Sequence, residues 1–296
     1  QGSINFQYEG EGTSTFTGVL LEGGTLRNGW DEKGNELADA SDAVISVDGV
    51  AVEVRGFTGV GGENETESVL ENVGLIEAND GTAAVYLTQN ANLLLTASEK
   101  GTITAGGTAD AIRLGADAGT LTLRGAKLEM KEGGSGNAVE NRSANAVNVY
   151  AADIQIEDGI GIHSEKINFG TLAGNATTIH ITGEGTGILQ EKVAEDGQGS
   201  ATDANLTFNN TVTVAGALLD GTDNDYRGTG IAANTTGTLE INGTLTGLNT
   251  GAVVLGDAAG VTVGANANIR VGSDAGEVAG AGIDLSSSGD TVKTVN

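Results

Sequence analysis

Two histidines are the side chains of this sequence best suited to acid–base chemistry near neutral pH. His163 follows Ile162, and His180 lies between Ile179 and Ile181. Apolar and polar residues alternate in both segments, which is typical of a half-buried strand. The alternation predicts that both imidazole rings face solvent, so we expect surface histidines and no catalytic residue. The chain has no cysteine, which excludes disulfides and thiolate metal sites.

The acidic stretch 220–225 holds a second group of candidates. Asp220, Asp223 and Asp225, with the amide of Asn224, place oxygen atoms close together, and such hard ligands suit Ca²⁺. The spacing does not match an EF-hand loop, which needs alternate acidic positions, a glycine at position six and a distal glutamate. We interpret the stretch as a solvated acidic loop, keep the three aspartates as weak metal candidates, and expect no metal and no cofactor.

The charge balance excludes two classes of partner. Lysine and arginine number 14 against 40 aspartates and glutamates, a formal net charge of −26 over 296 residues. Nucleic acids and anionic membranes bind basic patches, so neither is an expected partner. No apolar run approaches the roughly 18 residues that a membrane-spanning helix needs. We expect no direct insertion of this segment into a membrane.

A short pattern repeats along the chain: a small residue, valine or isoleucine, a variable residue, and often leucine. Residues 84–87 (AVYL) and 111–114 (AIRL) are two clear copies. Most copies lie 22 to 30 residues apart, with two longer gaps, and such a period indicates a solenoid. The branched residues of the pattern are Val19, Val44, Val85, Ile112, Val139, Ile162, Ile188, Ile231, Val253 and Ile283.

Most repeats contain further runs of alternating polarity, such as 120–123 (TLTL) and 128–130 (LEM). Three short strands per repeat, separated by Gly, Asn and Asp turns, favour a parallel β-helix. Leucine-rich repeats are the competing solenoid, but their LxxLxLxxN segment is absent. The sequence therefore predicts an all-β fold, a right-handed single-stranded parallel β-helix of about ten coils of three short strands, with the branched residues from 85 to 283 stacked inside.

Three interior positions in successive coils are polar: Asn141, Ser164 and Gln190. Buried polar groups need hydrogen-bond partners, so we predict that these side chains stack and bond along the axis. By the same alternation we expect Ile112→Asp to destabilise the fold strongly. Arg113→Asp should change only a solvated face, where Arg113 and Glu140 would be stacked neighbours able to pair.

The whole chain, 1–296, reads as one β-helix with long insertions near 55–72 and 191–229. Loops that interrupt a scaffold often contain binding sites. Outward positions add a polar ladder suited to weak lateral contacts that gain strength by multivalency. Leu189, Ala232 and Val254 form an apolar stretch, which is ordinary scattered exposure, a contact patch, or a surface covered by the loop 191–229. The candidate ligand or self-association residues are Thr122, Asn148, Thr207, Glu240, Thr262, Leu189 and Val254.

Gly-, Thr-, Asn- and Asp-rich coils without cysteine, such as residues 237–245 (GTLEINGTL), resemble the passenger domains of bacterial type V autotransporters, and most of all the AIDA-like self-associating adhesins. The resemblance implies a non-catalytic adhesin at the bacterial cell surface or secreted. Its partners would be copies of itself on neighbouring cells, host glycans or matrix proteins. Ten aromatic residues cannot supply the aromatic girdles of the family's translocator barrel, so we expect a passenger fragment.

Polysaccharide-processing enzymes, lyases or phage tailspikes, also use the β-helix and are the alternative. They pair acidic residues and line a groove with aromatic rings for sugars. This chain has no Asp-Asp dipeptide and no Gly-His-Gly segment. The stretch 288–290 (SGD) does not match the Gly-Asp-Ser-Gly motif of serine-protease autotransporters, and Trp30 is the one tryptophan. We therefore expect no enzyme.

Overall fold

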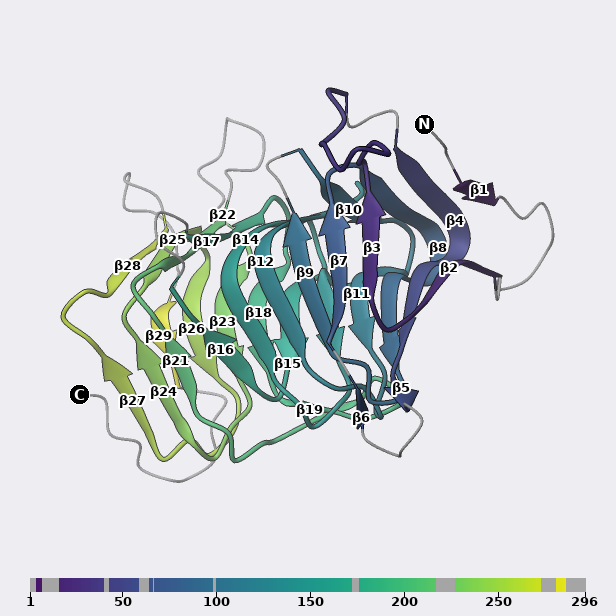
Figure 1. The fold of residues 1–296 in the computed structure, drawn as a ribbon. Coiled ribbons are helices and arrows are strands. Elements are labelled where there is room, and N and C mark those ends of the chain that lie inside the picture. Colours follow the sequence, from purple (N-terminus) through teal and green to yellow (C-terminus); the bar gives the residue numbers. More distant parts are fainter. Residues whose placement is uncertain are drawn as a thin grey trace.

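The structure, a computed structural model, is an all-β fold in which 62% of the chain lies in strands. Parallel strands form a long, nearly closed sheet consistent with a β-helix, and successive strands progress along its axis from the purple end to the yellow end (Figure 1). No helix capable of crossing a bilayer is found in the part of the chain described. The described residues are 4–6, 16–39, 43–58, 64–65, 67–97, 100–171, 176–216, 227–272 and 281–285.

Apart from two short antiparallel pairs, the described strands fall into three columns, here called faces. Neighbouring strands of a column pair in parallel, with one interruption in the second column. The first face carries the repeated pattern that the sequence shows. Its strands are β2 (Phe16–Glu22), the second halves of β4 (Val44–Arg55) and β8 (Leu75–Thr88), β11 (Asp110–Leu114), β13 (Val139–Asn141), β15 (Ile160–Ser164), β18 (Thr186–Gln190), β23 (Thr229–Ala233), β26 (Thr250–Val254) and β29 (Ala281–Asp284).

The second face is divided between the large sheet and a separate three-stranded sheet. In the large sheet it comprises β3 (Thr25–Asn28), β7 (Ser68–Asn72), β9 (Leu93–Ala97), the first halves of β12 (Leu121–Met130) and β14 (Val147–Ile156), and β16 (Ile167–Phe169). The separate sheet comprises β21 (Leu206–Phe208), β24 (Thr238–Ile241) and β27 (Gly260–Val263).

The third face closes the cross-section. It comprises β1 (Ile4–Phe6), the first halves of β4 and β8, β10 (Thr102–Ala105), the second halves of β12 and β14, β17 (Thr177–Ile181), β22 (Val212–Gly216), β25 (Thr244–Leu248) and β28 (Asn268–Val271). The long strands therefore bend from one face to the next. Register shifts mark these bends, and Gly81 (φ 105°) and Gly125 (φ 77°) adopt there a backbone conformation that favours glycine.

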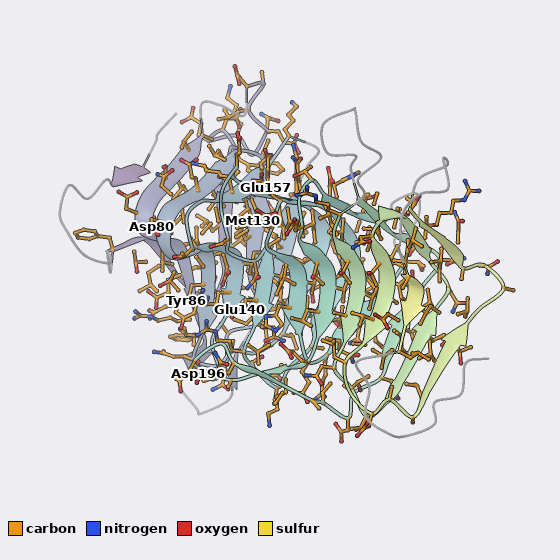
Figure 2. All side chains as sticks on the ribbon, turned by 180° about the vertical axis from the view of Figure 1, so that it is seen from behind. Asp80, Tyr86, Met130, Glu140, Glu157 and Asp196 are labelled. Atoms are coloured by element: carbon orange, nitrogen blue, oxygen red, sulfur yellow. The ribbon has the colours of Figure 1, made fainter. Side chains whose placement is uncertain are left out.

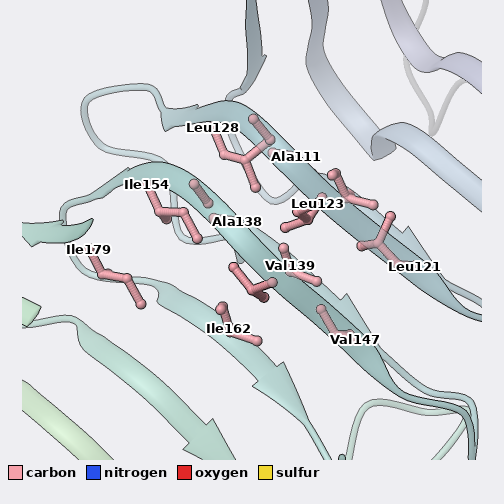
Figure 3. Close-up of a cluster of buried hydrophobic side chains, with 14 of the residues drawn as sticks. Ala111, Leu121, Leu123, Leu128, Ala138, Val139, Val147, Ile154, Ile162 and Ile179 are labelled. Atoms are coloured by element: carbon pink, nitrogen blue, oxygen red, sulfur yellow. The ribbon is translucent and has the colours of Figure 1, made fainter. Parts of the chain in front are cut away.

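The branched residues of the pattern stack inside the solenoid. Register pairing places Val85, Ile112 and Val139 in sequence, and the stack continues through Ile162 and later coils. These side chains are fully buried, and Figure 3 shows Val139 and Ile162 in one cluster with Leu121 and Leu123 of the second face. The interior stack is confirmed over this stretch, because apolar side chains one strand spacing apart remove each other from water.

One copy of the repeated pattern and one position of the predicted stack are wrong. Val44 lies on the third face, where it pairs with Leu75, and Val52 takes its place in the stack between Val19 and Val85. The second error is a shift of one residue at the other end of the chain, described next. In both cases several apolar residues follow closely in the sequence, so the pattern alone matches more than one register.

Ala252, not Val253, pairs with Ile231 and Ile283 and so occupies the stack. Val253 lies half-buried on the outer side. Val254, which we expected to face outward, is fully buried. Three consecutive apolar residues leave the alternation ambiguous there, and the neighbouring coils set the register.

The predicted polar stack is confirmed, and the predicted hydrogen bonding along the axis is confirmed between Asn141 and Ser164 only, since Gln190 Oε1 has no partner among the described residues. Asn141, Ser164 and Gln190 are each completely buried. The Asn141 Nδ2 atom donates to Ser164 Oγ at 2.9 Å, and Ser164 lies in register with Gln190. Gln190 Nε2 in turn donates to the carbonyl of Ala204 at 3.0 Å. The stack therefore satisfies donors inside an otherwise aliphatic core.

The insertions are shorter than predicted. Within 55–72, the antiparallel pair β5 (Phe57–Thr58) and β6 (Asn64–Glu65) leaves the solenoid, but β7 is a regular strand of the second face. Within 191–229, the antiparallel pair β19 (Lys192–Val193) and β20 (Gly199–Ser200) is an insertion, whereas β21 and β22 are regular strands. Residues 217–226 lie outside the described residues.

Candidate functional site

The predicted polar ladder of the second face is two ladders, because the face is divided between two sheets. The asparagine ladder consists of Thr122, Asn148 and Asn168, in register on β12, β14 and β16. Asn168 Nδ2 donates to Asn148 Oδ1 at 2.9 Å. All three side chains remain at least partly exposed. Their amide and hydroxyl groups can therefore bond to an approaching surface.

The threonine ladder consists of Thr207, Glu240 and Thr262, in register on β21, β24 and β27. Both threonines are exposed, and Glu240 is half-buried. Asn242 Nδ2 donates to Glu240 Oε1 at 2.8 Å and fixes that carboxylate. The structure thus brings together these three predicted residues, although not with Thr122 and Asn148.

The predicted apolar stretch is not an exposed patch. Leu189 is half-buried, Ala232 is buried, and Val254 is fully buried. Val254 is therefore not available to a partner, and the expectation that it contributes to a contact surface is wrong. Leu189 lies in register between His163 and Ala232 on the outer side of the first face.

The outer side of the first face carries a polar column: Glu53, Tyr86, Arg113, Glu140 and His163 lie in register on successive strands. Glu140 is 4% and His163 is 5% exposed. The expectation that His163 is a surface histidine is wrong, because the hairpin β19–β20 approaches this side. His180 is about half exposed, as predicted. Figure 2 shows Tyr86 and Glu140 on one side of the molecule, with Asp196 of the hairpin loop nearby.

Three hydrogen bonds hold the hairpin against the first face. His163 Nε2 lies 2.9 Å from Glu191 Oε1, and Asn234 Nδ2 donates to Glu191 Oε2 at 3.0 Å. Burial would raise the pKa of Glu191, but the hydrogen bonds from His163 and Asn234 outweigh it and lower that pKa. Arg142 Nη1 also donates to the backbone carbonyl of Glu195. The hairpin is thereby tied to the polar column at both ends of its first strand.

Arg113 and Glu140 of the column form a buried charge cluster with Asp110 and Arg142. Arg113 Nε contacts Asp110 Oδ2 at 2.5 Å and Glu140 Oε2 at 2.9 Å, which confirms the predicted pairing of Arg113 with Glu140. Arg142 Nη2 lies 3.2 Å from both oxygens of Glu140. Asp110 is 1% exposed, and nothing in the sequence analysis identified it.

The pKa values of the two carboxyl groups of the cluster shift in opposite directions. Burial raises the pKa of Asp110 well above its ordinary value, and the hydrogen bond with Glu140 and that residue's charge add to the shift. Burial opposes ionisation of Glu140 as well, but the hydrogen bond with Asp110 and the guanidinium groups of Arg113 and Arg142 lower its pKa. As pH rises, Glu140 therefore loses its proton before Asp110 does.

A cavity of about 580 Å³, the first-face pocket, opens beside the column and the hairpin. Two polar atoms in residues of its wall, Thr88 Oγ1 and Arg142 Nε, are buried without a hydrogen-bond partner among the described residues. Buried polar groups are normally paired; of these two, the Thr88 hydroxyl can donate or accept a hydrogen bond, whereas Arg142 Nε can only donate one. The residues of the wall used below are Glu53, Tyr86, Thr88, Arg113, Asp117 and Arg142.

In the described ranges, no group of three or more His, Cys, Asp or Glu side chains is arranged to hold a metal ion. The weak calcium candidates Asp220, Asp223 and Asp225 lie outside the described residues. No protein-family model, curated protein or solved structure matches this chain.

Proposed function

We propose that this chain is an adhesin of the AIDA-like autotransporter passenger class, placed at the bacterial cell surface or secreted. In this proposal the solenoid is a right-handed β-helix of about ten coils of three strands. It binds copies of itself on neighbouring cells, or host glycans or matrix proteins. It needs no cofactor, catalyses no reaction, and neither binds nucleic acid nor inserts into a membrane.

The observation that carries the proposal is the pair of exposed polar ladders. Thr207, Glu240 and Thr262 repeat at the strand spacing of a parallel sheet, and so do Thr122, Asn148 and Asn168. A second solenoid packed alongside would present polar groups at the same spacing, so several weak hydrogen bonds could form together. Each such bond is weak in water, and the sum gains from multivalency.

The buried carboxyl pair favours binding over the alternative, polysaccharide cleavage. A glycosidase needs two carboxyl groups that reach the scissile bond from opposite sides. Asp110 and Glu140 are almost completely buried, hydrogen-bond each other, and both contact Arg113. Neither oxygen pair is free to approach a sugar, so this arrangement supports a structural role for the two acids.

Display of the chain on cells that do not aggregate tests the proposal. The test variant replaces the threonine ladder: Thr207→Ala, Glu240→Ala and Thr262→Ala together. The matched control replaces the in-register column Asp153, Thr178 and Thr213 of the third face by alanine. Each triple removes two threonines and one acid, so the net charge and the number of hydroxyl groups change equally.

We expect the displaying cells to settle, the ladder triple to settle at least several-fold more slowly, and the control triple to settle like the parent. Capture of matrix proteins and glycans by the same cells is scored in parallel. Absence of both clumping and ligand capture by the parent, at equal display, would contradict the proposal. Release of reducing ends from polysaccharide would instead support the enzyme.

A further inference from the structure

We propose that the first-face pocket binds a sugar unit of an uncharged glycan. The inference rests on the proposed adhesive function and gives it a ligand class and a site separate from the ladders. Three features carry it: an aromatic ring in the wall, a dense mixture of donors and acceptors, and two buried polar atoms without partners. Each is considered in turn.

The pocket has the size and the aromatic surface that a sugar requires. About 580 Å³ lies within the range of small-molecule sites, roughly 300–1,000 Å³. Tyr86 is part of the wall and partly exposed. A Cβ atom at Gly115 would lie 3.2 Å from Tyr86 Oη, so the glycine leaves the tyrosine hydroxyl open. Aromatic rings with a polar tip suit ligands that have both apolar and hydroxyl-bearing sides.

The wall contains charged groups of both signs. Glu53 and Asp117 provide acceptors, while Arg113 and Arg142 provide donors. Sugar hydroxyl groups both donate and accept, so they can bond to every group in such a wall. An anionic ligand is disfavoured, because both guanidinium groups are already paired with buried carboxyl groups and further acids face it.

The atoms without partners indicate that the wall is incomplete by itself. Thr88 Oγ1 and Arg142 Nε are buried, and no group in the described part of the chain bonds to them. The Arg142 guanidinium also bonds to Glu140 and to the carbonyl of Glu195, so its side chain is held in place while its Nε–H group stays unpaired. The wall thus contains a hydroxyl group and an N–H donor that the described residues leave unsatisfied.

Titration calorimetry of the purified full chain with neutral gluco-, galacto-, manno- and N-acetylglucosamine oligosaccharides tests the inference. Tyr86→Ala removes the ring. Ala116→Trp fills the pocket from an exposed position of its wall and removes no hydrogen bond of the column. Tyr150→Ala is the matched control, since Tyr150 is a partly exposed tyrosine of the second face beneath Arg124. Thermal unfolding verifies that each variant folds.

We expect at least one neutral series to bind, both pocket variants to bind about tenfold more weakly or not at all, and Tyr150→Ala to bind like the parent. The inference is overturned if no neutral series binds, if sulfated or sialylated glycans bind in preference, or if neither pocket variant weakens binding. Settling of cells that display the same variants separates the two proposals. Clumping that persists without any sugar binding overturns the pocket assignment alone.

Discussion

At the residue scale, Arg113 lies between two buried carboxyl groups, Asp110 and Glu140. The sequence pattern places Arg113 on the outer side of its strand, and that placement is right. The pattern does not show that a hairpin approaches this side or that Asp110 is buried three residues earlier. The premise that Arg113 lies on a solvated face is therefore wrong. An aspartate there would add a third acid to the two carboxyl groups and would remove the guanidinium group that both contact.

We now expect Ile112→Asp and Arg113→Asp both to destabilise the fold strongly. The first removes a fully buried side chain, worth about 2–5 kcal/mol, and adds an unpaired charge. The second breaks a buried ion pair, worth about 3–5 kcal/mol. Thr122→Asp, on an outward position, should stay within about 0.5 kcal/mol. Urea unfolding compares the three variants, and a stable Arg113→Asp variant would refute the structural role of the cluster.

Asp110 gives a pH dependence with a defined sign. Its folded-state pKa is raised above the ordinary value of 3.8. Its favourable contribution is therefore complete below that value and is lost as pH rises through the folded-state pKa. Asp110→Asn keeps an amide donor toward Glu140 and cannot ionise. Thermal unfolding from pH 3 to pH 8 should show the variant gaining stability relative to the parent as pH rises, and parallel profiles would contradict this.

At the element scale, the hairpin β19–β20 depends on one carboxylate. Glu191 bonds to His163 and Asn234, whereas Glu195 contacts Arg142 only through its backbone carbonyl. We expect Glu191→Ala to lower the unfolding free energy by about 1.5–3 kcal/mol, as for hydrogen bonds to charged groups. Glu195→Ala should change it little. The folded state lowers the pKa of Glu191 below its ordinary value of 4.5. This stabilisation is therefore complete above pH 4.5 and is lost as pH falls through the folded-state pKa.

Equal effects of the two hairpin substitutions in urea unfolding would show that Glu191 does not fasten the hairpin. An added readout is hydrogen exchange of the β19–β20 amides. Exchange there should accelerate in Glu191→Ala and not in Glu195→Ala, because the hairpin opens locally before the solenoid unfolds.

The strand bends depend on glycine. Gly125 and Gly133 have similar left-handed backbones, with φ of 77° and 72°. A Cβ at Gly125 would lie 2.8 Å from the carbonyl oxygen of Ala97, whereas a Cβ at Gly133 meets nothing within 4 Å. Alanine at either site should cost about 1–2 kcal/mol for the backbone, and Gly125→Ala should cost more. Similar unfolding midpoints for both variants would contradict the steric argument.

The elements were predictable where the sequence alternates cleanly. Residues such as Val85 and Ile112 follow a small residue and precede a variable one, and the predicted stack holds there. The repeated pattern is misplaced at Val44, and the predicted stack is wrong at Val253, because consecutive apolar residues there permit two registers. The hairpin over His163 could not be predicted, because its position depends on tertiary contacts between residues nearly 30 positions apart. Asp110 escaped notice for the same reason.

At the scale of the whole molecule, the net charge of −26 opposes the lateral association proposed for the ladders. Two like-charged solenoids repel at a distance, while the hydrogen bonds of the ladders act only at contact. Salt shortens the range of the repulsion to about 8–10 Å near physiological ionic strength and affects neutral hydrogen bonds far less. Self-association should therefore strengthen with salt, whereas capture of a basic host protein should weaken with it.

The settling of cells that display the chain, measured across sodium chloride concentrations, tests the central claim most directly. We predict slow settling at low salt, a rise toward physiological salt as the repulsion is screened, and loss of this rise in the Thr207→Ala, Glu240→Ala, Thr262→Ala triple but not in the Asp153, Thr178, Thr213 control. Settling that is fastest at low salt, or that does not distinguish the two triples at any salt, would contradict adhesion through the polar ladders.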